Sequence, residues 1–214
     1  MYETEQEQIE AIKKWFSTWG NYLIGGVLVI ILGYGAGWFY MDQQRTAREA
    51  ASDQYQLILR HVGNAESLGE DQREQLDELV ANLAQAHPDS TYTTFGALLQ
   101  ARFAAVAGDF QAAEEHLRWA LAQNDDAVLG RTVNLRLARV QFAQGNHDAV
   151  LATLDSISPG TQLIGYNELR GDVYAARGDR AQAREAYASA WNAAQEQGLE
   201  RPLLQVKAEN YGVL

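Results

Sequence analysis

The chain of 214 residues contains no cysteine and only three prolines. The lack of cysteine excludes disulfides, thiolate nucleophiles and thiolate metal sites, but it leaves the compartment open, because oxidising and reducing spaces both contain cysteine-free proteins. With so little proline and abundant Ala, Leu, Gln, Glu and Arg, the sequence favours helices, and no alternation of β-branched residues indicates strands. We therefore expect an all-α fold.

Positive charge is scarce. From Asp42 onward the chain carries 15 basic and 24 acidic side chains, a net charge of −9. Such a surface repels the phosphates of nucleic acids and the headgroups of anionic lipids. We expect no nucleic-acid partner.

The sequence also has few candidates for catalysis. Its four histidines lie far apart, and no HExxH motif, paired carboxylate spacing or nucleophile motif accompanies them. The stretch "GYGAGW" falls inside an apolar run and lacks the strand and helix that a dinucleotide-binding motif requires. We expect a protein that is not an enzyme and that carries neither cofactor nor metal.

A long hydrophobic run stands near the N-terminus. No Asp, Glu, Lys or Arg occurs between Lys14 and Asp42, and as a helix the apolar centre at residues 22–40 is about 28 Å long, close to the hydrocarbon thickness of a bilayer. Tryptophan and tyrosine flank both ends, as expected at membrane interfaces. We predict an acidic tail at residues 1–20 and a transmembrane helix at residues 21–41.

Two alternatives to a permanent anchor fit less well. A cleaved signal would need a basic leader without acidic residues, whereas four glutamates accompany Lys13 and Lys14. The small residues that could serve as a cleavage site are also followed directly by aromatic residues. A buried helix of a soluble protein would be unusually long and uncharged. The numbers of Lys and Arg on the two sides of the run are nearly equal, so charge leaves its orientation open.

Glycines within the run form one face of the predicted membrane helix, at Gly26, Gly33 and Gly37. Small residues at such spacing let membrane helices pack with their backbones close together. Glycine is also common in membrane helices for no specific purpose. Packing against a partner helix is thus one of two interpretations.

A degenerate repeat fills most of the remaining chain. Gly108, Gly145 and Gly178 are 37 and 33 residues apart, close to the period of tetratricopeptide repeats. Each glycine suits the positive φ that ends a helix, and the Asp or Asn that follows it can cap the next one. We predict three tetratricopeptide-like hairpins at residues 91–198, stacked as an α-solenoid. Residues 42–90 should form a linker helix and an atypical first hairpin, and residues 199–214 a capping helix.

The first helices of these hairpins predict a binding groove on the inner face of the stack. Its expected residues are Phe95, Leu98, Arg102, Leu135, Arg139 and Phe142. Apolar side chains beside two arginines suit a polypeptide segment with an acidic side chain or a terminal carboxylate. Alternatively, the apolar residues belong to the core and the arginines pair with acids of neighbouring helices.

The order of these parts resembles the YfgM-like family, which comprises ancillary subunits of the bacterial SecYEG translocon. The likeness rests on "YETEQEQIEAIKKWF" at the front, "HPDSTYTTFGALLQARFAAVAGDFQAAEEHL" in the middle and "LLQVKAENYG" at the end. It implies a bacterial inner-membrane protein with a cytoplasmic N-terminus and a periplasmic domain. The implied partners are the SecYEG translocon, translocating polypeptides and a membrane-anchored periplasmic peptidyl-prolyl isomerase, besides the lipid around the anchor.

The resemblance thus implies a scaffold that links secreted proteins to periplasmic chaperones. The residues themselves leave two further functions open. One is a subunit of another envelope-assembly or cell-division complex, and the other is a membrane-tethered adaptor in stress regulation.

Overall fold

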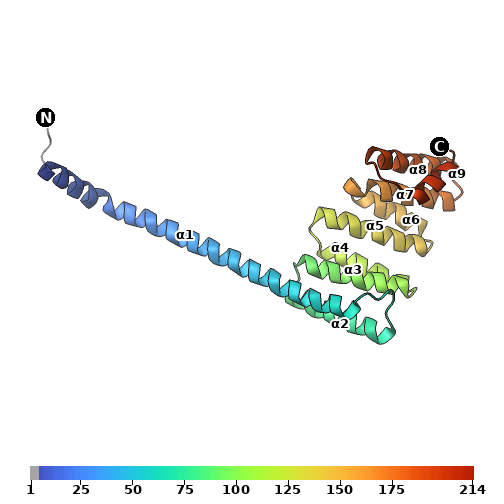
Figure 1. Cartoon of the computed structure of the whole chain (residues 1–214), viewed down its shortest axis with the longest axis horizontal. Helices are drawn as coiled ribbons and strands as arrows, with labels where there is room; N and C mark the ends of the chain where they lie inside the picture. Colours follow the sequence, from blue (N-terminus) through green and yellow to red (C-terminus); the bar gives the residue numbers. More distant parts are fainter. Residues whose placement is uncertain (1–4) are drawn as a thin grey trace. The chain divides into compact units, whose positions relative to one another are not determined.

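In the computed structural model, which describes residues 5–214, every regular element of the described part is helical (Figure 1). The expectation of an all-α fold is therefore confirmed. The chain divides into two compact units, residues 1–50 and 51–214. The long helix α1 (Glu5–Val62) contributes to both units.

The apolar run lies within α1. Its segment Gly25–Val62 contains a stretch long and apolar enough to cross a membrane, and no residue of that stretch is buried inside the protein. Val29, Ile30 and Leu32 each expose about 70 % of their surface. Exposed aliphatic side chains of this density are unfavourable in water but suited to a lipid environment. The chain therefore has one candidate membrane helix in its described part.

The second unit is a series of antiparallel helices in which each packs on its neighbours in the chain (Figure 1). After the end of α1 the elements are α2 (Glu70–Ala86), α3 (Thr91–Val106), α4 (Phe110–Gln123), α5 (Ala127–Ala143), α6 (His147–Ser156), the 3-10 turn η1 (Gly160–Gln162), α7 (Leu163–Ala176), α8 (Arg180–Glu196) and α9 (Pro202–Asn210). The turn η1 is not expected from the sequence.

The three glycine turns share one backbone geometry. Gly108, Gly145 and Gly178 have φ between 78° and 81°, and the residue after each glycine donates its N–H to a carbonyl five residues earlier at 2.9 Å. Asp109 and Asp179 then cap α4 and α8 through their side chains. These two caps form as the sequence predicts.

The middle turn differs in its cap. The expected side-chain cap by Asn146 is wrong, because no such bond forms at the start of α6. The Asn146 amide instead donates to Gln144 Oε1 at 3.0 Å. Asn146 can form this bond because its side-chain amide carries donor hydrogens. The carboxylates of Asp109 and Asp179 carry none and can only accept hydrogen bonds.

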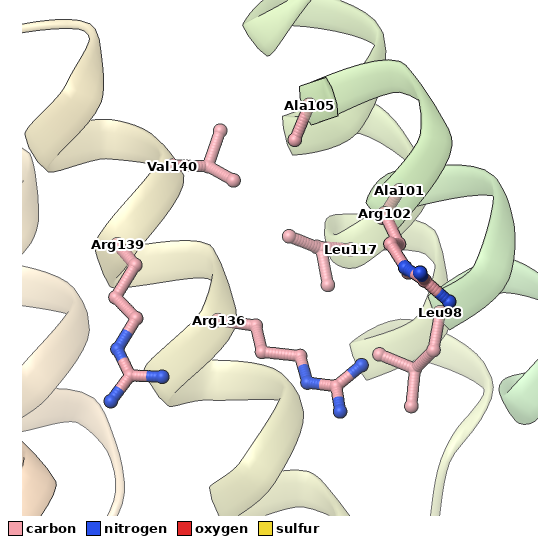
Figure 2. Close-up of a pocket in the computed structure, with 8 residues that line it drawn as sticks. All are labelled: Leu98, Ala101, Arg102, Ala105, Leu117, Arg136, Arg139 and Val140. Carbon is pink, nitrogen blue, oxygen red and sulfur yellow. The ribbon is translucent and has the colours of Figure 1, made fainter. Parts of the chain in front are cut away.

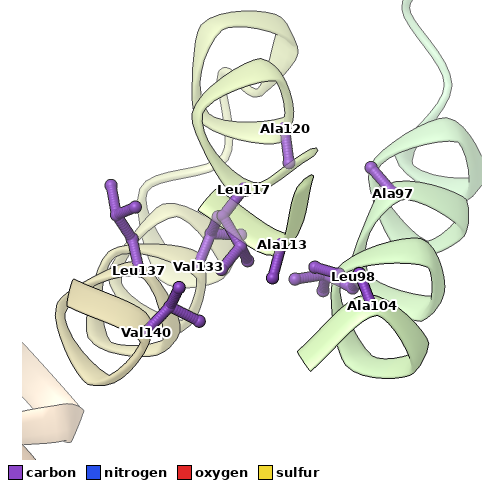
Figure 3. Close-up of a cluster of buried hydrophobic side chains, with 10 residues drawn as sticks. Ala97, Leu98, Ala104, Ala113, Leu117, Ala120, Val133, Leu137 and Val140 are labelled. Atoms are coloured by element: carbon purple, nitrogen blue, oxygen red, sulfur yellow. The ribbon is translucent and has the colours of Figure 1, made fainter. Parts of the chain in front are cut away.

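The core runs along the stack as consecutive clusters. In the first full hairpin, Ala97 of α3 and Ala113 and Ala120 of α4 are completely buried, and Leu117 fills the space between α3, α4 and α5 (Figure 3). Alanine at these positions lets the two helices approach closely, while the larger residue fills the gap to the next hairpin. This packing fixes the spacing between α3 and α5, where the groove lies.

Candidate protein-binding groove

A cavity of about 300 Å³ opens between α3 and α5, with α4 at its base (Figure 2). Its apolar lining comes from aliphatic side chains and its polar lining from three arginines, which together are Leu98, Ala101, Arg102, Ala105, Leu117, Arg136, Arg139 and Val140. On α3 these residues follow helical spacing, so that they share one face. We call this the apolar cavity.

A second cavity of about 250 Å³ lies between α5 and α7, where η1 and the connection from α8 to α9 complete its wall. It has a larger polar share and is lined by Thr132, Leu135, Arg136, Arg139, Thr161, Gln162, Ile164, Gly165, Gln197, Leu199 and Arg201. We call this the polar cavity. Arg136 and Arg139 line both cavities, so the two lie on either side of α5 and together form what we call the groove.

Three of the four arginines of the groove have no ionic partner. Among the side chains that the structure describes, no carboxylate oxygen lies within 4.0 Å of the guanidinium groups of Arg102, Arg136 or Arg139, whereas Arg201 of the polar cavity pairs with Glu168 at 2.8 Å. All three side chains are exposed. The guanidinium of Arg102 lies 5.1 Å from the ring centre of Phe103, a cation–π contact that leaves its N–H groups available.

The three guanidinium groups point in different directions. Arg102 extends from α3 and Arg136 from α5 at the two sides of the apolar cavity, whereas Arg139 extends along the other side of α5 (Figure 2). A Cβ atom at Gly165 of α7 would lie 3.7 Å from Nη2 of Arg139. Positive charge is thus present over the apolar cavity and also beside the polar one.

One acid of α4, Glu114, lines neither cavity and is already hydrogen-bonded. Glu114 of α4 accepts hydrogen bonds from Gln141 at 3.1 Å and from Arg118 at 2.7 Å. Burial alone would raise the pKa of Glu114, but the hydrogen bonds from Gln141 and Arg118 outweigh it and the pKa lies below its usual value. Glu114 is therefore ionised and already paired, so it does not neutralise Arg102, Arg136 or Arg139.

The structure brings together four of the six residues predicted for the groove. Leu98, Arg102 and Arg139 line the apolar cavity, and Leu135 and Arg139 line the polar one. Leu135 also packs in the core between α5 and α7, where a Cβ at Gly165 would lie only 2.7 Å from its Cδ2. Leu135 therefore combines a core position with a place in the cavity wall.

The two predicted phenylalanines line neither cavity. Phe95 is half-buried, with its ring centre 6.0 Å from that of Tyr55 and 6.3 Å from that of Tyr92. Phe142 stacks on His147 at 5.6 Å. Both phenylalanines pack against core clusters, as the alternative interpretation of apolar core residues predicts.

Sequence reasoning missed Arg136, which lines both cavities. Its position three residues before Arg139 puts it on the same face of α5, so helical spacing could have identified it. No sequence signal pointed to Thr161 and Gln162, because their place in the polar cavity depends on the unexpected turn η1.

The glycines of the candidate membrane helix have open surroundings. Apart from the neighbouring residues and backbone of the helix itself, a Cβ at Gly26, Gly33 or Gly37 would meet no described atom within 4 Å. In the described part of the chain, no group of three or more His, Asp or Glu side chains is placed to hold a metal ion.

Comparison with known proteins supports the family resemblance. A family model described as a tetratricopeptide repeat-like domain matches residues 13–213. The chain is 32 % identical over 213 residues to the ancillary SecYEG translocon subunit of Haemophilus influenzae, with 98 % of each chain covered. It is 32 % identical over 192 residues to the protein of that name from Escherichia coli K12, with 87 % of each covered. The Neisseria gonorrhoeae relative is 26 % identical over 206 residues, with 96 % of each covered.

No solved structure matches the chain. The similarity to the curated relatives covers the candidate membrane helix and the helical hairpins alike. The fold agrees with the family description, because glycine-turned helical hairpins follow the long apolar helix. The chain belongs to the family of ancillary SecYEG translocon subunits, with a tetratricopeptide repeat-like domain.

Proposed function

We propose that this protein is an ancillary subunit of the SecYEG translocon, anchored in the bacterial inner membrane by one helix. In this proposal its repeat domain lies in the periplasm and holds translocating polypeptides near a membrane-anchored peptidyl-prolyl isomerase. The observation that carries it is the similarity over 98 % of both chains to a relative described as such a subunit. Similarity of this extent supports a shared arrangement of anchor and domain.

The groove supports a binding role rather than a catalytic one. It offers aliphatic walls and three guanidinium groups without ionic partners in the described chain. Anchoring to the membrane of the translocon confines the groove to the neighbourhood of emerging polypeptides and raises their effective concentration. A scaffold can therefore act there through modest affinities.

Site-specific photo-crosslinking in native membranes tests this proposal. A photo-reactive residue at Arg139 should give adducts with translocon subunits, the isomerase or secreted polypeptides. The same residue at Arg184, which is exposed on α8 and lines neither cavity, is the matched control. Adducts at Arg139 with cell-division or outer-membrane assembly proteins instead would favour a subunit of another envelope complex and contradict the proposal.

We further propose that Gly26, Gly33 and Gly37 contact a membrane helix of the translocon. The support is their common face and the open space at their Cβ positions, where the described chain places no atom beyond the neighbouring residues and backbone of the helix itself. The double variant G33L/G37L should reduce co-purification of the translocon from mild detergent. Gly35→Leu is the control, because residue 35 lies on the opposite side of the helix. Equal loss in both variants would contradict a specific contact.

A further inference from the structure

Three arginines of the groove lie in an otherwise acidic protein without being neutralised by it. The chain from Asp42 onward has a net charge of −9, yet Arg102, Arg136 and Arg139 have no carboxylate within 4.0 Å in the described residues. Two of them, Arg102 of α3 and Arg136 of α5, line the apolar cavity from its two walls (Figure 2). Like charges placed in this way repel each other, and an anion bound between them would relieve that repulsion.

The groove also provides an apolar contact next to these charges. Leu98 and Leu117 are almost completely buried, and with Val140 and two alanines they form the walls of the apolar cavity. A cavity of about 300 Å³ can take one aliphatic side chain together with part of its backbone. A suitable ligand therefore combines an aliphatic group with adjacent carboxylates.

The second cavity indicates that the ligand continues across α5. Neighbouring helices are about 10 Å apart, so the centres of the two cavities are separated by a similar distance. An extended chain covers about 10 Å in three residues. Arg136 and Arg139 line both cavities, so they lie where the residues between the two anchors would pass.

We propose that the groove binds an extended, internal polypeptide segment in which an aliphatic residue is followed by acidic residues. This inference deepens the proposed function and rests on it. The aliphatic side chain occupies the apolar cavity, the acidic side chains accept hydrogen bonds from Arg102, Arg136 and Arg139, and the segment continues into the polar cavity. A terminal carboxylate would fill the first cavity alone and leave the second unused.

The shape and charge of the surroundings favour a peptide over a lipid surface. A bilayer with anionic headgroups presents many charges to the whole domain, and the acidic surface repels it. A single segment brings only a few carboxylates and places them directly at the guanidinium groups. Bidentate geometry with arginine adds specificity for carboxylates.

Fluorescence anisotropy on the full-length protein in detergent micelles tests the proposal. The probe is a labelled synthetic peptide of about ten residues with the central sequence Leu-Asp-Glu-Asn, and the control peptide replaces the two acids by Asn and Gln. Hydrogen bonds to charged groups imply at least about tenfold weaker binding of the amide peptide. Arg136→Gln should weaken binding of the acidic peptide about tenfold or more, and Arg136→Lys should weaken it less.

Arg184→Gln makes the same change of charge outside the groove and should leave affinity within about twofold. Thermal unfolding separates a binding role of Arg136 from a structural one. If Arg136 serves binding, Arg136→Gln keeps or raises the Tm of the free protein because it removes repulsion from Arg102. A lowered Tm together with unchanged peptide affinity would overturn the proposal.

Equal affinity for the acidic and amide peptides would also overturn it, as would a loss in Arg184→Gln that matches the loss in Arg136→Gln. Binding to vesicles of anionic phospholipid that depends on Arg136, without binding of the acidic peptide, would assign the groove to lipid and refute the peptide. If the translocon still co-purifies with the chain in any of these cases, the proposed function stands and only the inference about the ligand fails.

Discussion

At the scale of single residues, the third hairpin depends on a contact between a glycine and a tyrosine. A Cβ added at Gly171 of α7 would lie 2.5 Å from Cδ1 and Cε1 of Tyr187. The Tyr187 ring is buried, and its hydroxyl donates a hydrogen bond to Asp172 at 2.8 Å. The absence of a side chain at Gly171 is therefore what lets α7 and α8 pack at their observed distance.

Gly171→Ala should destabilise the domain by about 1–2 kcal/mol. Overpacking costs about 1–3 kcal/mol, and the better helix propensity of alanine offsets up to about 1 kcal/mol of it. Urea unfolding of the purified protein measures this free energy. In the Tyr187→Leu background, Gly171→Ala should lower the free energy of unfolding by clearly less, because the aromatic ring that the added Cβ would contact is absent. An unchanged cost there would show that the strain arises elsewhere.

A partly buried network joins α7 to α9. Lys207 donates hydrogen bonds to Glu168 at 2.9 Å and to Asp172 at 2.8 Å. Burial alone would lower the pKa of Lys207, but its hydrogen bonds with Asp172 and Glu168 outweigh it and the pKa lies above the ordinary 10.5. Burial, with the Asp172 hydrogen bond, also raises the pKa of Tyr187 above the ordinary 10.0.

Stability should consequently fall in alkali. A raised pKa means that the folded state holds its proton more tightly, so both contributions are complete below the ordinary pKa values and are lost as pH rises above 10.0 and 10.5. Thermal unfolding between pH 8 and about 11.5 should show this decline. In Lys207→Met the decline should be shallower, and an equally steep decline would assign it to other groups.

At the scale of elements, the last helix docks through one face. Leu204 and Ala208 of α9 are completely buried and Leu204 packs in the core cluster of α7 and α8, whereas Leu203 exposes 77 % of its surface. Arg201 adds an ion pair with Glu168 at 2.8 Å. The helix α9 thus covers apolar surface of α8.

Leu204→Ala should weaken this docking by about 2–5 kcal/mol, because it removes buried methyl groups and leaves a cavity. Leu203→Ala is a matched control one residue away, and its effect should stay within about 0.5 kcal/mol. Hydrogen exchange of α9 amides reports the local effect and urea unfolding the global one. Similar losses in both variants would indicate that α9 is held through its other face.

At the scale of the whole molecule, the proposed function requires the chain to remain in the membrane with its ends in different compartments. Because the sequence contains no cysteine, single labels can be introduced without background. Glu10→Cys in the tail region and Glu196→Cys at the end of α8 are exposed positions.

In intact cells with a permeabilised outer membrane, a membrane-impermeant maleimide should label Glu196→Cys and leave Glu10→Cys unlabelled. Disruption of the inner membrane should allow both to react. The reverse pattern would place the domain in the cytoplasm, and labelling of both variants in intact cells would contradict a retained membrane helix. Folding is monitored in parallel by circular dichroism.

The sequence by itself determined the features that depend on local chemistry. An uncharged run of sufficient length predicts a membrane helix whatever follows it. Glycine followed by aspartate predicts the turns at Gly108 and Gly178 because φ and capping are properties of adjacent residues. Helical spacing is local in the same sense, and it predicts that Leu98, Arg102 and Arg139 lie on the inner faces of their helices.

Only the tertiary structure decided which of these residues share a cavity. Phe95 and Arg102 lie on the same helix, yet the former packs with Tyr55 and Tyr92 while the latter opens to solvent beside Arg136. Glu114 pairs with Arg118 within α4, but the hydrogen bond that it accepts from Gln141 of α5 likewise depends on contacts between helices. Such contacts join residues far apart in the chain, and their geometry follows from how whole helices pack, which no local pattern encodes.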